Sequence, residues 1–160
     1  MRHARVAILD VDVHHGNGTQ GMFYERGDVL TVSIHADPHA LYPFFWGHAH
    51  ERGAGAGEGA NLNLPLAFGS GDDVFLAAVA KAATRIHLFS PGALVLALGL
   101  DASEADPYRA LAVTTAGFER IGAAVAGLGL PTVIVQEGGY LSPILGDNLA
   151  AALRGFEETA

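Results

Sequence analysis

Cysteine is missing from the sequence entirely. Disulfide bonds and thiolate metal sites are therefore excluded, and the absence is typical of intracellular proteins. Long apolar runs are missing too, because no stretch reaches the roughly 18 uninterrupted apolar residues that suit a membrane span. The opening residues, Met1 to Arg5, lead straight into an apolar run and do not have the shape of a signal peptide. We therefore expect a cytoplasmic protein that does not insert into a membrane.

Basic residues are scarce relative to acidic ones. The chain has 9 Lys and Arg against 17 Asp and Glu, which gives a formal net charge of −8. An excess of negative charge disfavours contact with phosphate backbones, so we do not expect nucleic acid as a partner. The same charge is compatible with small cationic ligands.

Four short apolar runs rich in Val, Ile and Leu divide the chain, at residues 6–13, 29–35, 94–100 and 132–136. None alternates cleanly with polar residues, and continuous apolar strands are typical of parallel sheets covered by helices. Helical patterns lie between or after them, at about residues 72–89, from Thr114 or Thr115 to about Gly127, and from Ser142-Pro143 onward. The order predicts an α/β fold, a parallel sheet with flanking helices, and the length fits a single domain over residues 1–160.

The segment from His35 to Leu66 departs from this pattern. It contains Tyr-Pro-Phe-Phe-Trp at residues 42–46, then His48, His50 and a run rich in glycine. A connection of this length is usually functional or disordered, and the dense aromatic residues favour order. We expect a structured loop at the rim of a site; the alternative is that the aromatics only pack the loop onto the core.

Polar residues gather where the apolar runs end. Asp10, Asp12 and His14 alternate at the end of the first run, and in an extended strand they would share one face. The other runs end in Ser33-Ile34-His35, in Asp101, and in Glu137-Gly138-Gly139-Tyr140. Because ligands of open parallel sheets bind at the carboxyl ends of the strands, these groups are expected to converge there.

A metal ion would account for this convergence. Carboxylates and an imidazole crowded on one face repel one another or go unsatisfied unless a cation lies among them. One His and two Asp suit Zn²⁺ and leave coordination positions open, as in a catalytic site. Singly, each residue has an ordinary explanation as a cap, a turn residue or an incidental histidine. Their joint placement at successive strand ends favours the metal site.

Three motifs resemble the zinc-dependent histone deacetylase superfamily. They are Asp-Val-Asp-Val-His-His-Gly-Asn-Gly-Thr-Gln from Asp10, Leu-Gly-Leu-Asp-Ala-Ser-Glu-Ala-Asp-Pro from Leu98, and Glu-Gly-Gly-Tyr from Glu137. Asn17-Gly18-Thr19-Gln20 is similar to the class II and bacterial members. The aromatic segment at residues 42–49 and the segment at residues 57–65 look most like the bacterial acetylpolyamine amidohydrolases. The resemblance implies an arginase/deacetylase-like fold with its metal site at the carboxyl ends of the strands.

The resemblance also assigns roles to residues of this chain. It makes Asp12, His14 and Asp101 the ligands of Zn²⁺, and Tyr140 the catalytic hydroxyl that stabilises the oxyanion when a metal-activated water attacks the amide. It gives a structural K⁺ or Na⁺ the ligands Asp10, Asp12, the carbonyl groups of His14 and Ile34, and Ser33. Tyr42 and Gly138 are implied to bind the substrate, a small acetylated amine such as an acetylpolyamine, or an acetyl-lysine side chain.

The family's tandem His pair, the general base and its partner, lies upstream of the first motif and is absent from this chain. Asp10 and Asn17 resemble the residues that contact that pair. We therefore expect the chain to be the C-terminal portion of a deacetylase catalytic domain, with an exposed sheet edge that favours a homo-oligomer. The alternatives are an inactive truncated remnant that binds metal or is only structural, and an arginase-like dimanganese ureohydrolase.

Overall fold

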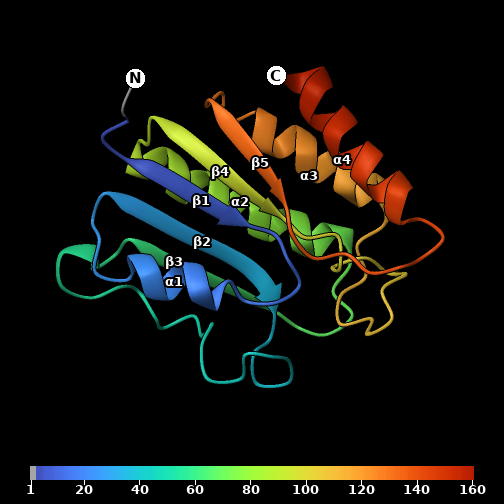
Figure 1. Cartoon of the computed structure of the whole chain (residues 1–160), viewed down its shortest axis with the longest axis horizontal. Helices are drawn as coiled ribbons and strands as arrows, with labels where there is room; N and C mark the ends of the chain where they lie inside the picture. The colour runs from blue at the N-terminus through green and yellow to red at the C-terminus, as the bar shows by residue number, and fades with distance from the viewer. Residues whose placement is uncertain (1–2) are drawn as a thin grey trace.

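The computed structural model describes residues 3–160 and contains one parallel sheet flanked by helices (Figure 1). The strands are β1 (Val6–Asp10), β2 (Val29–Ala36), β3 (Asn61–Leu66), β4 (Ala93–Leu98) and β5 (Thr132–Gln136). The helices are α1 (Asn17–Phe23), α2 (Asp72–Phe89), α3 (Thr115–Ala126) and α4 (Leu145–Thr159), with a 3-10 turn at Gly55–Gly57. The predicted fold class, a parallel sheet with flanking helices, is confirmed.

The strands lie in the order β3-β2-β1-β4-β5, and every neighbouring pair is parallel. Their arrowheads in Figure 1 therefore point to one common edge. The strand order reverses at β1, which has β2 on one side and β4 on the other. In open parallel sheets, such a reversal opens a crevice at the carboxyl ends of the two diverging strands. The residues that follow β1 and β4 lie at this crevice.

The core lies on the face of the sheet that α2 covers. Alternate residues of β1 and β4, among them Leu9, Leu94 and Leu96, are almost fully buried, and Phe75 and Ile86 of α2 are completely buried. α3 packs against both α2 and α4. Gly71 precedes α2, and the Thr114 hydroxyl accepts a hydrogen bond from the Gly117 N–H at the start of α3, where this helix was expected to begin.

The opposite face of the sheet is covered less completely. α1 lies in front of it near β2 in Figure 1. The β5 residues Val133 and Val135 remain 61% and 41% exposed. Within the described residues β5 pairs only with β4, so its outer edge is open. Open strand edges pair readily with other chains. The expected homo-oligomer remains a prediction, and the open edge of β5 is one surface through which it could form.

Two elements were not predicted from the sequence. The segment at residues 35–66, expected to be a rim loop throughout, ends in strand β3, and helix α1 begins at Asn17, in a stretch for which no helix was expected. β3 alternates Asn and Leu because it is an edge strand that uses one row of side chains for polar contacts. The last helix begins at Leu145 rather than at Ser142-Pro143.

The aromatic residues of the rim do not pack the loop onto the core. Tyr42, Phe44 and Trp46 are about half exposed, and Phe45 is 85% exposed. This exposure argues against the alternative that these side chains serve only to pack the loop onto the core. No helix in residues 3–160 is long and apolar enough to cross a membrane.

The contact between α3 and α4, which lie side by side in Figure 1, generates a stability prediction. A Cβ atom at Gly155 would overlap the backbone carbonyl of Glu119, whereas one at Gly146 of the same helix would meet nothing. Gly155→Ala should lower the free energy of unfolding by about 1–3 kcal/mol, since a backbone cannot yield easily.

Gly146→Ala is the matched control, and it should raise the free energy of unfolding by about 0.5–1 kcal/mol because alanine is the better helix former. Urea denaturation of the two variants and the unaltered chain measures both effects. A Gly155→Ala variant as stable as Gly146→Ala would contradict the close helix contact.

Candidate metal centre

The crevice at the switch point brings together Asp12, His14 and Asp101. Asp12 and His14 follow β1 and Asp101 follows β4, and these two strands pair directly. Each residue offers a ligand atom, and these atoms all lie within 4.8 Å of one another. The three residues expected from the sequence to bind a metal therefore form one group, which can hold a metal ion.

Two tight turns, rather than a strand face, bring Asp12 and His14 into place. The Asp12 N–H donates to Asp10 Oδ1 over 3.0 Å, and the His14 N–H donates to Asp12 Oδ1 over 2.8 Å. β1 ends at Asp10, so the prediction that one extended strand runs on to Val13 and puts these side chains on one face is wrong. Asp side chains that bond to the backbone two residues onward compete with the strand ladder and turn the chain.

Asp101 is the most buried member of the group. Its side chain is 1% exposed, and Oδ1 accepts a hydrogen bond of 2.9 Å from the Val13 N–H. Oδ2 is buried and has no hydrogen-bond partner. Burial raises the pKa of Asp101, because a charge away from water is costly. A cation at this point would satisfy the unpaired oxygen, which is the observation that fits the group to a metal.

The His14 ring is placed between the two carboxylates. Its Nδ1 lies 3.1 Å from Asp12 Oδ1 and 3.4 Å from Asp101 Oδ2. The nearby carboxylates of Asp101 and then Asp12 raise the pKa of His14 to about 10. The site thus favours positive charge strongly. A divalent ion supplies that charge without a proton on the nitrogen, and one nitrogen with two carboxylates suits Zn²⁺ with coordination positions left open.

Gly138 lies directly against the carboxylates of Asp12 and Asp101. Its N–H donates to Asp12 Oδ2 over 3.1 Å, and its carbonyl accepts from the Leu100 N–H over 2.9 Å. A Cβ at this position would overlap carboxylate oxygens of both Asp12 and Asp101. Only glycine therefore allows the loop after β5 to approach so closely.

Two aromatic side chains flank the group. Tyr140, which follows Gly138 in the loop after β5, is half exposed. Partial desolvation and the negative charges of Asp101 and Asp12 raise the pKa of Tyr140, so its hydroxyl keeps its proton near neutral pH. On the other side, the Tyr42 ring meets the His14 ring edge-on, with centroids 6.3 Å apart.

The other residues expected to hold a monovalent cation lie next to the metal group, in β1 and β2. Asp10 and Ser33 are register partners across β1 and β2, both are buried, and Ile34 follows Ser33 within β2. Burial raises the pKa of Asp10 to about 7. The Ser33 hydroxyl accepts from the Gly16 N–H over 3.3 Å and lies 2.8 Å from His35 Nδ1.

A small hollow of about 220 Å³ opens beside the metal group. Asp10, Asn17 and Glu137 are among the residues that line it, together with Asp12 and His14. His15 also belongs to the lining of this hollow. Its ring is buried, its Nε2 lies 3.0 Å from Gln20 Oε1, and its pKa is lowered by burial.

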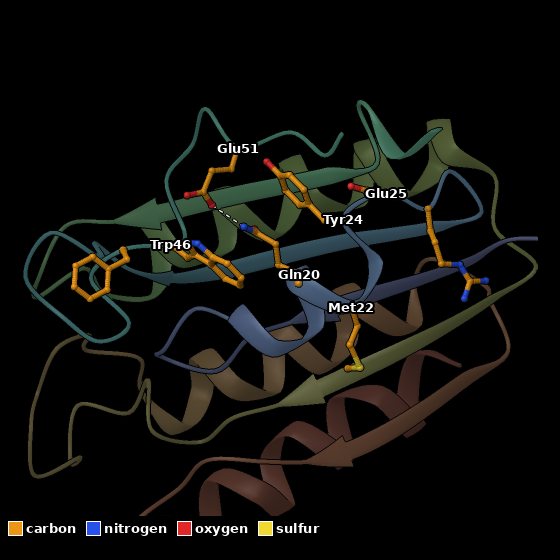
Figure 2. A pocket seen from close by; sticks show the side chains of 9 residues that line it. Gln20, Met22, Tyr24, Glu25, Trp46 and Glu51 are labelled. Atoms are coloured by element: carbon orange, nitrogen blue, oxygen red, sulfur yellow. Dashed lines mark hydrogen bonds between the residues drawn. The ribbon is translucent and has the colours of Figure 1, made fainter. Parts of the chain in front are cut away.

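A buried polar network behind the site could not be foreseen in detail. Gln20 Oε1 accepts from the amides of Asn61 and Asn63, and Gln20 Nε2 donates to Glu51 Oε2 over 2.7 Å, the bond dashed in Figure 2. Glu51 Oε2 also accepts from the Gly47 N–H. The network ties α1 and β3 to the rim loop. Its only sequence signal is the alternation of Asn61 and Asn63 with leucine.

The cavity shown in Figure 2 has a volume of about 600 Å³ and is not part of the metal centre. It lies between α1 and the rim loop, where Trp46 and Tyr24 face Gln20 and Glu51. None of Asp12, His14 and Asp101 lines it. The chemistry of the donor groups, rather than the size of the cavity, marks the metal centre as the candidate site.

The proteins and structures that resemble this chain agree on one family. The chain is 51% identical to acetylpolyamine amidohydrolase 1 of Pseudomonas aeruginosa over 156 residues, which cover 98% of this chain and 45% of that protein. It is 41% identical over 155 residues to a probable deacetylase of Methanothermobacter thermautotrophicus, covering 96% of this chain and 46% of that protein. The crystal structure of acetylpolyamine aminohydrolase from Burkholderia pseudomallei superposes with a TM-score of 0.96 at 51% identity, covering 99% of this chain and 46% of that one.

The chain thus spans about half the length of the curated relatives it matches. The model of the histone deacetylase domain matches residues 1–156. The chain belongs to the histone deacetylase domain family.

Proposed function

We propose that this chain is the metal-binding portion of a zinc-dependent amidohydrolase that removes acetyl groups from acetylated amines, either acetylpolyamines or acetyl-lysine side chains. The observation that carries the proposal is the buried, unpaired Oδ2 of Asp101 beside His14 Nδ1. The relatives named acetylpolyamine amidohydrolases support the substrate class, and the net charge of −8 suits an amine.

Each residue of the site has a proposed role. Asp12, His14 and Asp101 would hold Zn²⁺, which when bound activates a water molecule and polarises the amide carbonyl. Tyr140 would donate its hydroxyl proton in a hydrogen bond to the developing oxyanion. Tyr42, beside the His14 ring, and Gly138, against the carboxylates of Asp12 and Asp101, would contact the bound substrate.

The cation beneath the site is part of the proposal. Asp10, Asp12 and Ser33, with the backbone carbonyls of His14 and Ile34, would bind K⁺ or Na⁺. The carboxylate of Asp10 is buried and its pKa is raised to about 7, so a neighbouring cation would restore its negative charge. That charge would in turn stabilise an imidazole placed in the hollow above it.

The general base is proposed to come from residues outside these 160. His14-His15 is the one adjacent histidine pair in the sequence, and His15 is buried with its Nε2 3.0 Å from Gln20 Oε1. The hollow lined by Asp10 and Asn17 is the proposed seat for an incoming imidazole. Loss of a general base typically lowers the rate about 10²–10⁴-fold, so a non-catalytic metal-binding remnant is the second candidate for the chain alone.

Replacing Asp101 tests the metal group. We expect Asp101→Ala to lose one Zn²⁺ per chain relative to the unaltered chain, because it removes the most buried ligand. Zinc analysis after equilibrium dialysis measures the stoichiometry, with circular dichroism to verify the fold. Asp73→Ala, which alters a carboxylate that is 97% exposed, is the control and should keep all its zinc. Unchanged zinc in Asp101→Ala would refute the ligand assignment.

Chemical rescue separates an enzyme from a remnant. The zinc-loaded chain should hydrolyse an acetylated diamine slowly, and added imidazole should raise the rate until the hollow is saturated. Asp10→Asn should weaken the rescue, since the carboxylate that steadies the imidazolium is lost. Released acetate is the readout. If no acetate forms at any imidazole concentration while zinc is bound, the chain is a remnant.

The oxyanion role of Tyr140 is tested in the same rescued reaction. Tyr140→Phe should reduce the rate by about 10²–10³-fold, since one hydrogen-bond donor to the transition state is removed. Bound zinc should not change. Tyr24→Phe, which removes a hydroxyl at the separate cavity beside α1, is the matched control and should leave the rate unaltered. Equal rates in the two variants would exclude Tyr140 from the chemistry.

A further inference from the structure

Three histidines of the rim loop gather beyond the end of β2, away from the metal centre. The ring centroids of His39 and His48 are 4.7 Å apart, and those of His48 and His50 are 5.6 Å apart. The rings line a hollow of about 470 Å³ together with Asp37, Ala49 and Pro65. None of these residues belongs to the proposed zinc site or to the cavity beside α1.

The spacing of the rings suits a shared metal ion. A Zn–N bond of about 2.0–2.1 Å and tetrahedral geometry place the centres of two imidazoles on one ion roughly 5 Å apart. Both observed separations lie close to this value, but the His48 and His50 rings are stacked with an interplanar angle of 10°, so one of them must rotate before both nitrogens can reach one ion. Among the described residues only Asp12, His14 and Asp101 already have ligand atoms within 4.8 Å, so the three rings must turn their nitrogens inward. His39 and His50 are exposed, and exposed side chains rotate without moving the backbone.

Asp37 orients the His39 ring and leaves one ring nitrogen available for a metal. Its Oδ1 lies 2.8 Å from His39 Nδ1 and also accepts the His39 backbone N–H over 2.9 Å. A carboxylate only accepts, so Nδ1 carries the proton and the lone pair of Nε2 is left free. Histidines that bind metals commonly donate their other nitrogen to a carboxylate in this way, which fixes the ring and raises its basicity.

The backbone around His48 is fixed by the buried network. The His48 carbonyl accepts the Glu51 N–H over 3.0 Å and the side-chain amide of Asn63 over 3.2 Å. His39 is attached through Asp37 to the end of β2, and Asp37 itself donates its N–H to the carbonyl of Leu66 in β3. The two sides of the aromatic segment at residues 42–46 are therefore held near one another before any ligand binds.

We propose that His39, His48 and His50 bind a second divalent transition-metal ion at the rim, with Asp37 orienting His39. Imidazole ligands select late first-row metals such as Zn²⁺ and Ni²⁺ rather than Mg²⁺ or Ca²⁺. The ion would join the two ends of the loop that carries the exposed aromatics at residues 42–46, and so hold Tyr42 at the approach to the metal centre. Metal binding at this site does not depend on the proposed deacetylase activity.

Zinc titration in an Asp101→Ala background isolates the second site. This variant should still bind one Zn²⁺ per chain, and adding His48→Ala should weaken that binding at least tenfold. Adding His87→Ala, which removes an exposed histidine of α2, is the control and should change nothing. Failure of Asp101→Ala to bind zinc, or equal binding by the His48→Ala and His87→Ala versions, would overturn the proposal.

A variant that keeps the first site guards against misfolding caused by Asp101→Ala. His48→Gln/His50→Gln in the otherwise unaltered chain should reduce the zinc stoichiometry from two to one. Asp37→Asn should keep both ions but weaken the second about 10–100-fold. Nitrogen-15 spectra of the histidines give a direct readout: zinc should shift Nε2 of His39 and leave Nδ1 protonated. Zinc on Nδ1 would contradict the role of Asp37.

Discussion

The buried carboxylate of Asp101 is the constraint on which the rest of the site depends. Its Oδ1 accepts the N–H of Val13, a residue 88 positions away in sequence, and its Oδ2 lies against the ring of His14. A charge removed from water needs compensation, and one backbone hydrogen bond leaves half of this carboxylate unpaired. The ends of β1 and β4 therefore meet around a group that is stabilised fully only by a cation. The close approach of Gly138 follows from the same need, since any side chain there would displace the oxygens.

The parallel sheet brings these polar groups together while the core stays apolar. Register fixes Asp10 opposite Ala97 on one side and opposite Ser33 on the other, so every strand delivers its polar residues to one edge. The apolar strands and α2 build the core, while the charged groups lie beyond the strand ends. Packing thus determines where the donors lie, and the turns made by Asp10 and Asp12 determine how they are aimed.

Sequence alone could predict the parts of the molecule that rest on simple periodicity. Continuous apolar runs predicted four of the five strands, and a carboxylate directly after such a run predicted that Asp101 would lie at the site. β3 was missed because its polar side chains bond to Gln20, a partner distant in the chain that no local pattern reveals. α1 was missed because Asn17 and Gly18 are turn formers, and in this chain the surrounding tertiary structure outweighed their local preference. The extended strand through His14 failed because side-chain hydrogen bonds replaced the ladder.

The two proposed metal sites differ in the physical origin of their affinity. The metal centre is preorganised: its carboxylates are fixed by backbone N–H groups, and burial makes an unpaired state costly, so an ion should bind tightly and exchange slowly. The rim histidines are more exposed and must rotate to converge, so ordering their side chains reduces the net binding energy. The rim site should consequently be the weaker of the two and fill only after the centre. Because it spans the loop that carries Tyr42, its occupancy would affect access to the centre without touching the ligands there.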